Sequence, residues 1–498
     1  MNSARAGIKP DLFLLLTRVR QLLIEQDIEC YIVGGLVRDL FLGRETADID
    51  IAVAADALDV AQNVASALGG KYVLLDTVNK IARVVLEKEV AGHWEIDFST
   101  FEGNIEQDLK RRDFTIDAMA IELKRLDDPI NFKLIDPLDG LADLRQKLIR
   151  AVSDTVFSAD AARLLRAVRL AAELNFTIDN NTEALIRRGS QLIKGVAGER
   201  NREELLRLLA SPHAGRFTFY LDELGLLTSL IPELAVMKGV EQLREHHWDV
   251  FNHSLKTVEA CDFLLRQNGW EYADKEVLAE VPWMAVIVEY FDREVSYGST
   301  RGLLLKMAAL LHDIAKPQTK TIETDGRTRF IGHAKEGAAI AADILQRLRF
   351  STKEIELVQT IVGNHLRPTQ MAQEGLPTHR AIYRYFRDTG EAGIGTLFIS
   401  LADHLATRGP NLDSSNWREH TRLVEYVLAK YLEEESIARP SKLIDGYDII
   451  KLFSLKPGPQ VGEILEAVRE AQASGEITNR QKALDFVKKL VEKGPADK

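Results

Sequence analysis

The pattern of apolar and polar positions changes along the 498-residue chain. Residues 30–135 hold short apolar runs that alternate with segments of helical period, which predicts a small domain of strands and helices. After residue 139 the apolar positions recur almost throughout at helical spacing, apart from a hairpin predicted at 319–332 that turns at Asp325 and Gly326. We expect an α/β domain followed by three helical domains, with boundaries at 1–140, 141–220, 221–415 and 416–498.

Composition is that of an ordinary globular protein, with 46% hydrophobic and 28% charged residues. The only two cysteines, Cys30 and Cys261, fit a reducing compartment, so a cytoplasmic location is expected. The apolar run at 12–16 is far shorter than a membrane span, and no membrane partner is expected. The net charge is −11, yet residues 145–216 hold thirteen Lys and Arg against eight Asp and Glu. Such a basic region can follow a phosphate backbone, although solvated helix faces explain the charge equally well.

Two short motifs near the N-terminus carry the first candidate chemistry. An apolar run ends at Gly34 and Gly35, where a turn lets backbone N–H groups approach a phosphate with a helix N-terminus behind it. Asp48 and Asp50 then alternate with isoleucines, so both carboxylates project from one face of a strand. Paired carboxylates need a cation, and two Mg²⁺ ions suit carboxylate and phosphate oxygens together. Either motif alone is weak, because an isolated Asp-x-Asp is most often a solvated strand edge, but together they indicate nucleotidyl transfer.

The ordered motifs resemble the head domain of the polymerase-beta-type nucleotidyltransferases, specifically the bacterial (class II) tRNA CCA-adding enzymes and their poly(A) polymerase relatives. The resemblance covers residues 28–212. It implies Mg²⁺ as the cofactor of the head, tRNA as a partner, and CTP as a substrate, with ATP as a second nucleotide left open. It also implies nucleotide contacts for Gly34, Gly35, Arg38, Arg111, Arg112, Asp113, Asp160, Arg163, Arg166 and Arg169.

A third catalytic acid is expected on a later strand of the head. The run at 94–98 offers Glu95 and Asp97 on one face, and either can fill the family's position. The run at 111–118 resembles the family's Arg-Arg-Asp-Phe-Thr-x-Asn-Ala motif, whose arginine forks suit phosphate and sugar oxygens. Asp117 stands where the family has Asn, which puts any amide-specific contact at that position in doubt.

The segment between these two motifs is short. Many CCA-adding relatives resemble this chain elsewhere but carry a longer flexible loop here, where only residues 99–107 are present. In the family, that loop is associated with the change from CTP to ATP for the last addition, and relatives lacking it tend to stop after two cytidines. Addition of CC alone, and addition of CCA by a subfamily with a shortened loop, both remain open.

The region after the head carries a candidate for base choice. Ser158 is expected to cap a helix in which Asp160 and Arg163, three residues apart, share one face. Such a pair is usually a weak surface ion pair. In a nucleotide pocket, however, the carboxylate accepts from the exocyclic amino group of cytosine or adenine and the guanidinium donates to a ring nitrogen. Uracil and guanine oppose the carboxylate with a carbonyl oxygen instead. The stretch resembles the family's Glu-Asp-x-x-Arg template motif, with Ala159 in place of Glu.

Histidines and aspartates recur in the second half in the order of an HD metal domain. A carboxylate on an apolar helix needs a partner, so we predict a divalent ion held by His253, His312, Asp313 and Asp403. Two further histidines, His333 and His365, would add ligands or contact a phosphate substrate. The region resembles the HD superfamily of phosphohydrolases, which implies a divalent transition metal or Mg²⁺ and hydrolysis of phosphomonoesters or cyclic phosphodiesters as a secondary activity.

These patterns predict an α/β polymerase-beta-like nucleotidyltransferase head followed by a mostly α-helical neck, an HD domain and a C-terminal helical tRNA-binding module. The predicted function is tRNA 3′-end nucleotidyl transfer. Two alternatives stand beside it: a poly(A) polymerase, and an HD-type phosphohydrolase whose head only binds RNA. Within the HD region, Lys316 and Arg367 lie near enough in sequence to serve a phosphate. The oligomeric state is left open.

Overall fold

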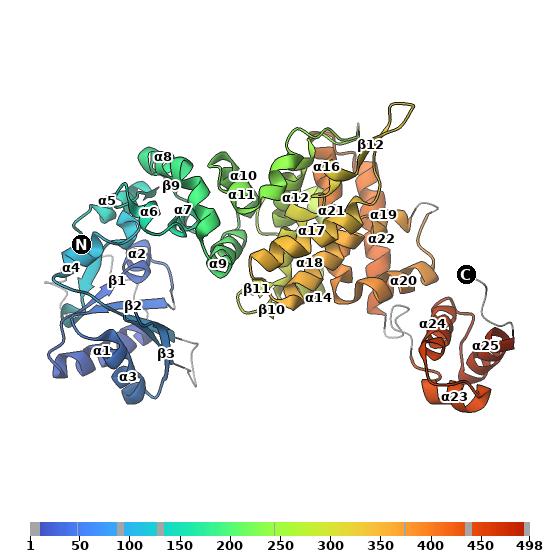
Figure 1. Ribbon diagram of the computed structural model, residues 1–498, viewed down its shortest axis with the longest axis horizontal. Helices are drawn as coiled ribbons and strands as arrows, with labels where there is room; N and C mark the ends of the chain where they lie inside the picture. The colour runs from blue at the N-terminus through green and yellow to red at the C-terminus, as the bar shows by residue number, and fades with distance from the viewer. Residues whose placement is uncertain are drawn as a thin grey trace. The chain divides into compact units, whose positions relative to one another are not determined.

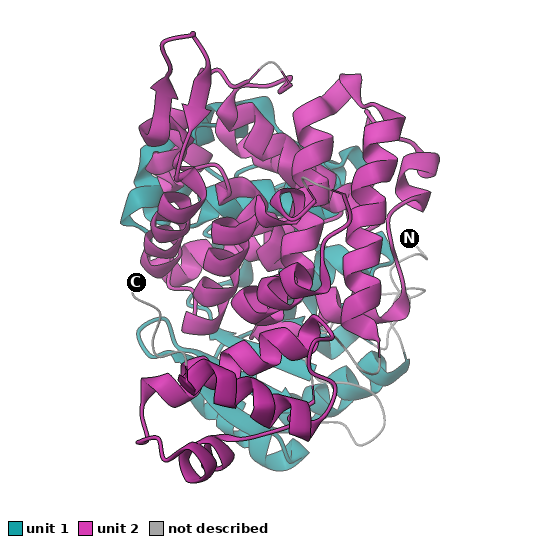
Figure 2. Ribbon diagram, turned by 90° about the vertical axis from the view of Figure 1, so that its right-hand side faces the viewer, with its two compact units in different colours: residues 1–196, 224–226 teal, residues 197–223, 227–498 magenta. Residues whose placement is uncertain are grey.

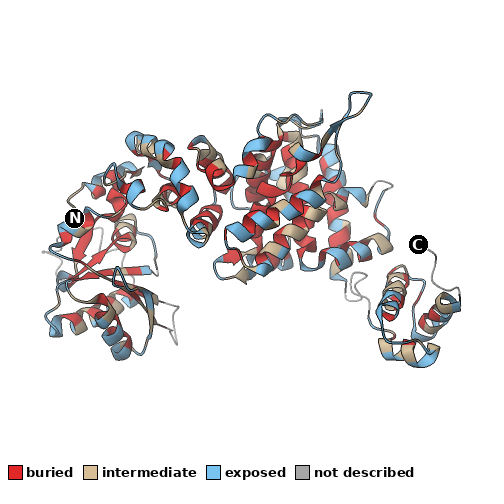
Figure 3. Ribbon diagram, viewed as in Figure 1, coloured by how far each residue is buried: buried red, intermediate tan, exposed pale blue. Residues whose placement is uncertain are grey.

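Figure 1 shows the protein in a computed structural model, which describes residues 10–46, 48–86, 94–126, 134–243, 245–372, 375–433 and 441–492. The chain divides into two compact units, residues 1–196 with 224–226, and residues 197–223 with 227–498 (Figure 2). Both units contain many buried residues, which Figure 3 marks in red. No helix in the described part of the chain is long and apolar enough to cross a membrane.

The first unit is built on a seven-stranded sheet with the strand order β3-β4-β5-β2-β1-β6-β7. The strands are β1 (Cys30–Val33), β2 (Asp48–Val53), β3 (Lys71–Asp76), β4 (Ile81–Leu86), β5 (Trp94–Thr100), β6 (Ala120–Glu122) and β7 (Leu134–Ile135). β2 and β5 run parallel, whereas the other neighbouring pairs are antiparallel. The predicted α/β head is therefore confirmed.

The two faces of β2 differ because its residues alternate in polarity. Ile49, Ile51 and Val53 are buried on one face. On the other face, exposed Asp48 begins the strand and Ala52 near its end joins a core cluster with α4. The acid end of the strand thus stays open while its far end is covered. The helices of the head are α1 (Pro10–Glu25), α2 (Gly35–Leu42), α3 (Ala57–Leu68), α4 (Ile105–Leu109) and α5 (Gly140–Gln146).

The division between the units falls inside the predicted neck. The helices α6 (Val156–Ala159), α7 (Arg163–Leu174) and α8 (Asn180–Gly189) belong to the first unit, and α9 (Gly198–Leu209) and α10 (Ala214–Glu223) to the second. A short parallel pair, β8 (Leu148–Ile149) with β9 (Thr177–Ile178), interrupts the predicted helical run. Two-residue strands leave no periodic signal in a sequence, which is why the pattern missed them.

The rest of the second unit is helical, as predicted. Its helices are α11 (Leu227–Leu230), α12 (Val250–Leu264), α13 (Lys275–Ala279), α14 (Ala285–Asp292), α15 (Arg301–Leu311), α16 (Lys316–Thr319), α17 (His333–Arg347), α18 (Thr352–Asn364), α19 (Arg367–Gln370), α20 (His379–Thr389), α21 (Gly393–Arg408) and α22 (Ser414–Leu432). The predicted hairpin is present as β12 (Lys320–Ile322) and β13 (Thr328–Phe330), with Gly326 at φ +82° in the turn. A second hairpin, β10 (Glu294–Ser296) with β11 (Ser299–Thr300), was not predicted.

A fully buried ion pair ties α9 and α10 to the helices that follow. Lys306 Nζ on α15 lies 2.7 Å from Asp262 Oδ1 and donates to the Leu209 carbonyl at 2.7 Å and to Gln267 Oε1 at 2.6 Å. The other oxygen of Asp262 accepts from the Gly215 N–H at 2.8 Å. Because a buried charge requires partners, these bonds fix the ends of α9 and α10 against α12 and α15.

The last three helices form a module with its own core. They are α23 (Gly446–Phe453), α24 (Pro459–Ala473) and α25 (Arg480–Glu492). Side chains such as Ile449, Val468 and Val487 bury one another inside this module. Asp445 begins it with a capping box, in which its side chain accepts from the Asp448 N–H at 3.0 Å.

Candidate functional sites

Four carboxylates meet on one face of the head sheet. Asp48 and Asp50 on β2 stand beside Glu95 and Asp97 on the parallel strand β5, because the register pairs Asp48 with Glu95 and Asp50 with Asp97. Neighbours in register point to the same face of a sheet, so all four side chains project together. Asp48 therefore shares a face with Asp50, and Glu95 shares one with Asp97, as the alternation predicted. The register adds that both pairs lie on the same face.

An arginine on the next strand holds both candidates for the third acid. Arg83 of β4 lies opposite Asp97 in the register and donates from Nε and Nη2 to its two oxygens, at 2.7 and 2.9 Å. Its Nη1 also donates to Glu95. Sequence reasoning missed Arg83, although a single arginine within the apolar run 81–86 was a signal for it. The geometry leaves the choice between Glu95 and Asp97 open, because one guanidinium orients both.

The electrostatics of this face favour a cation. Burial raises the pKa of Asp50 to about 6; Arg112 opposes this shift, while the nearby charges of Asp97 and Asp48 add to it. A carboxylate with a raised pKa among other carboxylates gains from a positive neighbour. Hard divalent ions such as Mg²⁺ prefer oxygen ligands of this kind, so the residues present fit the ion that the head is predicted to use.

The Gly34 turn closes one side of the acid face. Gly34 has φ +70°, a conformation that L side chains rarely adopt. A Cβ atom added there would lie 2.8 Å from Asp50 Oδ2 and 3.1 Å from Arg112 Nη1. Glycine is thus required both for the turn and for the close approach of the backbone to Asp50. Gly35 follows as the first residue of α2.

Arg38, on the helix α2 that follows this turn, is held by two aspartates. It donates from Nε to Asp39 Oδ1 at 2.9 Å and from Nη1 to Asp117 Oδ1 at 2.8 Å. Burial raises the pKa of Asp117, and Arg38 opposes that rise. The carboxylate that replaces the family's amide is therefore balanced by a cation, and Arg38 is anchored inside the head.

The base-choice pair sits at a helix junction. Residue Asp160 lies in extended backbone between α6 and α7, and α7 begins at Arg163. The prediction that Ser158 caps a helix containing both residues is wrong: the Ser158 hydroxyl donates to the Thr155 carbonyl inside α6. Asp160 Oδ1 instead accepts from the Ala162 N–H at 3.1 Å, in the turn that precedes α7. The Asp160 and Arg163 side chains still approach to 3.9 Å.

The other arginines predicted to bind nucleotide have different surroundings. Arg111 is exposed, and its carbonyl accepts from Arg163 at 3.3 Å. Arg166 Nη1 donates to buried Asp113 at 3.1 Å; although burial acts in the opposite direction, Arg166 holds the pKa of Asp113 below its ordinary value. Arg169 is buried and donates to Glu173 at 2.7 Å. Arg166 thus joins α7 to the segment that holds Asp113, and Arg169 makes a contact within α7.

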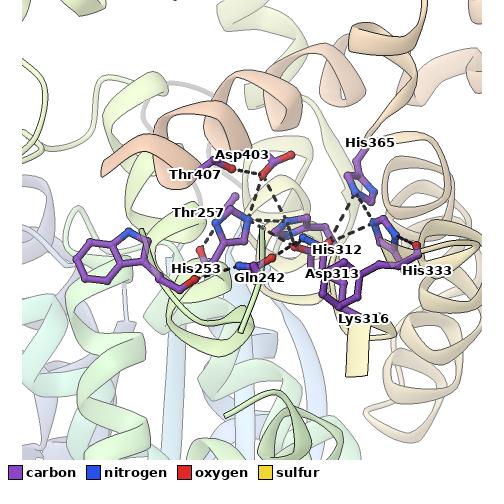
Figure 4. Close-up of polar contacts among 12 residues, drawn as sticks. Gln242, His253, Thr257, His312, Asp313, Lys316, His333, His365, Asp403 and Thr407 are labelled. Atoms are coloured by element: carbon purple, nitrogen blue, oxygen red, sulfur yellow. Dashed lines mark hydrogen bonds and ion pairs between the residues drawn. The ribbon is translucent and has the colours of Figure 1, made fainter. Parts of the chain in front are cut away.

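A histidine–aspartate group forms in the second unit (Figure 4). His253 lies on α12, His312 and Asp313 directly follow α15, and Asp403 lies on α21. His253 Nε2 is 3.2 Å from His312 Nε2 and 3.0 Å from Asp403 Oδ1. His312 Nε2 is 3.2 Å from Asp313 Oδ2. Three helices thus bring together the four residues predicted as metal ligands.

A second group forms around the same aspartate. His333 begins α17, His365 follows α18, and their Nε2 atoms are 3.3 Å apart (Figure 4). Asp313 Oδ1 lies 3.4 Å from His333 Nε2 and 3.9 Å from His365 Nε2. The ligand atoms of Asp313, His333 and His365 lie within 4.8 Å of one another, as do those of His253, His312 and Asp403. Each group is compact enough for one ion, and Asp313 faces both.

Local hydrogen bonds orient three of these histidines. The Nδ1 atoms of His312, His333 and His365 lie 2.8, 2.6 and 2.7 Å from backbone carbonyl oxygens three residues earlier, at Ala309, Phe330 and Val362. A carbonyl only accepts, so Nδ1 donates and the Nε2 lone pair of the neutral ring points into the group. Facing lone pairs repel one another unless a cation lies between them. Burial lowers the pKa of His365 to about 4, which favours the neutral form that binds metal.

Cations near this cluster are already paired. Lys316 Nζ lies 2.6 Å from Asp313 Oδ2 and donates to Gln242 Oε1 at 2.6 Å, so it supports a predicted ligand, and its contact with a phosphate stays a prediction. Arg367 pairs with Asp388 at 2.7 Å. Sequence reasoning also missed His246, whose ring centre is 5.3 Å from that of His253. It precedes α12 in a loop, where no periodicity marks it.

Comparison with known proteins agrees with the two kinds of domain that carry these groups. Four family models match in succession: the poly A polymerase head domain at residues 30–150, the probable RNA and SrmB- binding site of polymerase A at 175–238, the HD domain at 250–408 and the putative tRNA nucleotidyltransferase domain 2 at 415–487. The A-adding tRNA nucleotidyltransferase of Deinococcus radiodurans is 34% identical over 93% of this chain and 96% of its own length. The CC-adding tRNA nucleotidyltransferase of Thermus thermophilus is 32% identical, over 92% and 93%.

Solved structures agree in fold. A Thermotoga maritima CCA-adding enzyme complexed with tRNA aligns over 98% of this chain and 97% of that chain, with a TM-score of 0.60 at 22% identity. Head and histidine cluster together define a polymerase-type nucleotidyltransferase that carries an HD domain. The chain belongs to the bacterial class II tRNA nucleotidyltransferase family, the family of the CCA-, CC- and A-adding enzymes.

Proposed function

We propose that the protein adds two cytidines to the 3′ end of tRNA that lacks CCA and then stops. The single observation that carries nucleotidyl transfer is the face on which Asp48 and Asp50 stand in register with Glu95 and Asp97, against the Gly34 turn. The two relatives described above, which span more than nine-tenths of the chain, are named A-adding and CC-adding tRNA nucleotidyltransferases, and this supports tRNA as the substrate.

The head residues would act by positioning and charge. Asp48 and Asp50 would hold two Mg²⁺ ions, which activate the tRNA 3′-hydroxyl and neutralise the departing pyrophosphate when bound. Arg83 would keep Glu95 and Asp97 aimed at the same face. Phosphate oxygens of the nucleotide would approach the backbone at Gly34, where no side chain intervenes.

Base choice would rest on the helix junction. The Asp160 carboxylate would accept from the amino group of cytosine and Arg163 would donate to its ring nitrogen. Uracil would set a carbonyl oxygen against the carboxylate, and an unpaired buried polar group costs about 1–3 kcal/mol. The pair admits adenine as well as cytosine, so it does not by itself decide between CC and A.

The short connection after β5 supports addition of one kind of base. Residues 101–104 join β5 to α4, and the Phe101 N–H donates to the Val53 carbonyl at 3.1 Å. The Phe101 side chain is buried in one cluster with Ile105 and Leu109 of α4. Phe101 thus anchors the connection to the core, and only the three exposed residues 102–104 remain before α4, which is a short segment for reshaping the pocket from CTP to ATP. Relatives that lack a longer loop tend to stop after two cytidines, and this favours CC over A.

A nucleotide-addition assay tests the proposal. A tRNA transcript that ends at the discriminator base would receive CTP, ATP or both, and a transcript ending in CC would receive ATP. Two cytidines on the first transcript and no addition to the second are expected. Addition of A to the CC transcript alone would reassign the protein as A-adding, a complete CCA would show that the short connection does not limit base choice, and a long A tail would point to a poly(A) polymerase. The Asp48→Asn, Asp50→Asn double variant serves as the inactive control.

A second activity is proposed for the HD domain. The two histidine groups that share Asp313 would hold two divalent ions and hydrolyse phosphomonoesters or cyclic phosphodiesters. The test is metal analysis of the purified protein, followed by assays with p-nitrophenyl phosphate and a 2′,3′-cyclic nucleotide across Mg²⁺, Mn²⁺, Co²⁺ and Ni²⁺. Hydrolysis that Asp313→Asn abolishes supports the proposal. A protein that binds divalent metal and hydrolyses neither substrate would limit the groups to a structural role.

A further inference from the structure

The C-terminal module contacts the HD domain through a row of arginines on α20. Arg380, Arg384 and Arg387 recur at positions i, i+4 and i+7, so they share one face of this helix. The opposite face is buried through Ile382, Phe386 and other apolar residues. At a rise of about 1.5 Å per residue, the three guanidinium groups span about 10 Å along the axis.

Glutamates of the module meet these arginines in reverse order. Arg380 Nη2 donates to Glu476 at 2.7 Å, Arg384 donates to Glu470, and Arg387 Nη1 donates to Glu466 at 3.1 Å. Residue numbers rise along α20 as they fall along the module. The row of glutamates therefore runs antiparallel to the row of arginines and contacts it. Helices α20 and α24 are labelled in Figure 1.

In these ion pairs, another anion can replace the glutamate. The side chains of Arg380, Arg384 and Arg387 are 43%, 51% and 37% exposed in the docked state. Exposed pairs of this kind contribute little to stability and weaken further with salt. The module has its own buried core, which does not include α20. Solvent and other anions can thus reach the charges of this contact, which the buried Tyr383 supports by donating its hydroxyl to Glu466 at 3.0 Å.

We propose that α20 is an RNA-backbone-binding face and that the acids of the module cover it as an internal competitor. Regularly spaced arginine forks on one helix face bind phosphate oxygens as readily as carboxylates. A row of carboxylates, like a phosphate backbone, presents negative charges one after another. The bound RNA would release the module from α20, so the same glutamates that dock the module oppose RNA binding. The inference rests on the proposed function, because tRNA is the RNA in question.

The two sides of the contact predict opposite effects. Replacing the module's acids, as Glu466→Gln, Glu470→Gln and Glu476→Gln, uncovers the arginines and should tighten tRNA binding severalfold. Replacing the arginines, as Arg380→Gln, Arg384→Gln and Arg387→Gln, removes phosphate contacts and should weaken it. If the contact only fixed the module in place, both variants would break it equally. The affinity for tRNA would then change in the same direction in both.

The experiment measures the dissociation constant for tRNA lacking CCA, by fluorescence anisotropy at several salt concentrations with the full-length protein. Loss of three phosphate contacts should reduce the slope of log K against log salt by about 2. Removing negative charge anywhere tightens RNA binding, so the acid variant is compared with Glu463→Gln, Asp485→Asn and Glu492→Gln, three exposed acids of the same module. The arginine variant is compared with Arg293→Gln, Arg327→Gln and Arg418→Gln, three exposed arginines outside α20.

The outcomes separate the proposals. Opposite changes, each larger than in its control and with matching thermal unfolding curves, support the α20 face. Changes in one direction, or an acid variant no tighter than its control, overturn it. Nucleotide addition by the wild type is measured in parallel: a wild type that adds nucleotides while the variants fail this test leaves the proposed function standing. A wild type that neither binds tRNA nor adds nucleotides overturns both.

Discussion

Replacing Asp160 by Asn isolates the charge of the base-choice pair. The side chain keeps its size and its carbonyl oxygen, which can still accept from the Ala162 N–H that Asp160 now binds at 3.1 Å. The turn before α7 is therefore preserved, whereas Ala at this position would remove this hydrogen bond, which is worth about 1 kcal/mol. The new amide can turn its NH₂ toward a carbonyl, so uracil finds a donor where it now meets a carboxylate.

The magnitude follows from one unpaired polar contact. Relieving a penalty of about 1–3 kcal/mol changes a rate ratio by about 5- to 150-fold, since each 1.4 kcal/mol is a factor of ten. The ratio of kcat/KM for CTP to that for UTP should fall by this factor. The change should come from faster incorporation of uridine and also from slower incorporation of cytidine, because the NH₂ group that meets a uracil carbonyl would oppose the amino group of cytosine.

The assay measures single incorporations on tRNA lacking CCA, with each nucleotide alone. Asp154→Asn, an exposed aspartate of the same region, is the matched control and should leave the ratio unchanged. An unchanged ratio in folded Asp160→Asn protein would refute the assignment of base choice to this pair. Equal loss with both nucleotides would instead identify Asp160 as a residue that positions α7.

Four further outcomes are expected. Asp50→Asn should lower kcat by at least about a thousandfold while tRNA affinity, measured by anisotropy, stays within twofold. Arg83→Lys should retain more activity than Arg83→Gln and should raise the Mn²⁺ concentration needed for half-maximal binding, followed by electron paramagnetic resonance. Asp313→Asn should remove divalent metal from the HD domain in elemental analysis and leave nucleotide addition intact. Lys306→Met should cost about 3–5 kcal/mol of stability in denaturant unfolding by leaving Asp262 buried without its cation. Because burial holds the folded-state pKa of Asp262 above its unfolded value, that deficit should shrink as pH falls toward 4 and be largest above the folded pKa.

The sequence predicted features that depend on residue spacing. Alternation in residues 48–53 placed Asp48 and Asp50 on one face, and the apolar helices with His312 and Asp313 predicted a cluster in the second half. The HD family match agrees with that region. These predictions succeed because period and polarity are local properties that burial then selects.

Features that depend on the pairing of strands or helix ends were not predicted. Arg83 reaches Glu95 and Asp97 only because β4 pairs with β5 in one register, which no local pattern specifies. Asp160 was expected within a helix, but it lies in extended backbone after α6, and its carboxylate accepts from the Ala162 N–H in the turn before α7. Likewise, the contacts of α20 with the module depend on tertiary packing. From the sequence alone, a row of charges on a helix is explained equally well as a solvated face.

The orientation of the HD histidines has a consequence for how that cluster assembles. His312, His333 and His365 each bind a carbonyl oxygen only three residues back, at a helix end. Each ring is therefore aimed by a fragment of four residues, independently of the distant helices that complete the group. The ligands would be preset as their helix ends form, and packing has only to bring finished parts together. Substitutions in the surrounding core would then change the spacing between histidines before they change the direction in which any of them points.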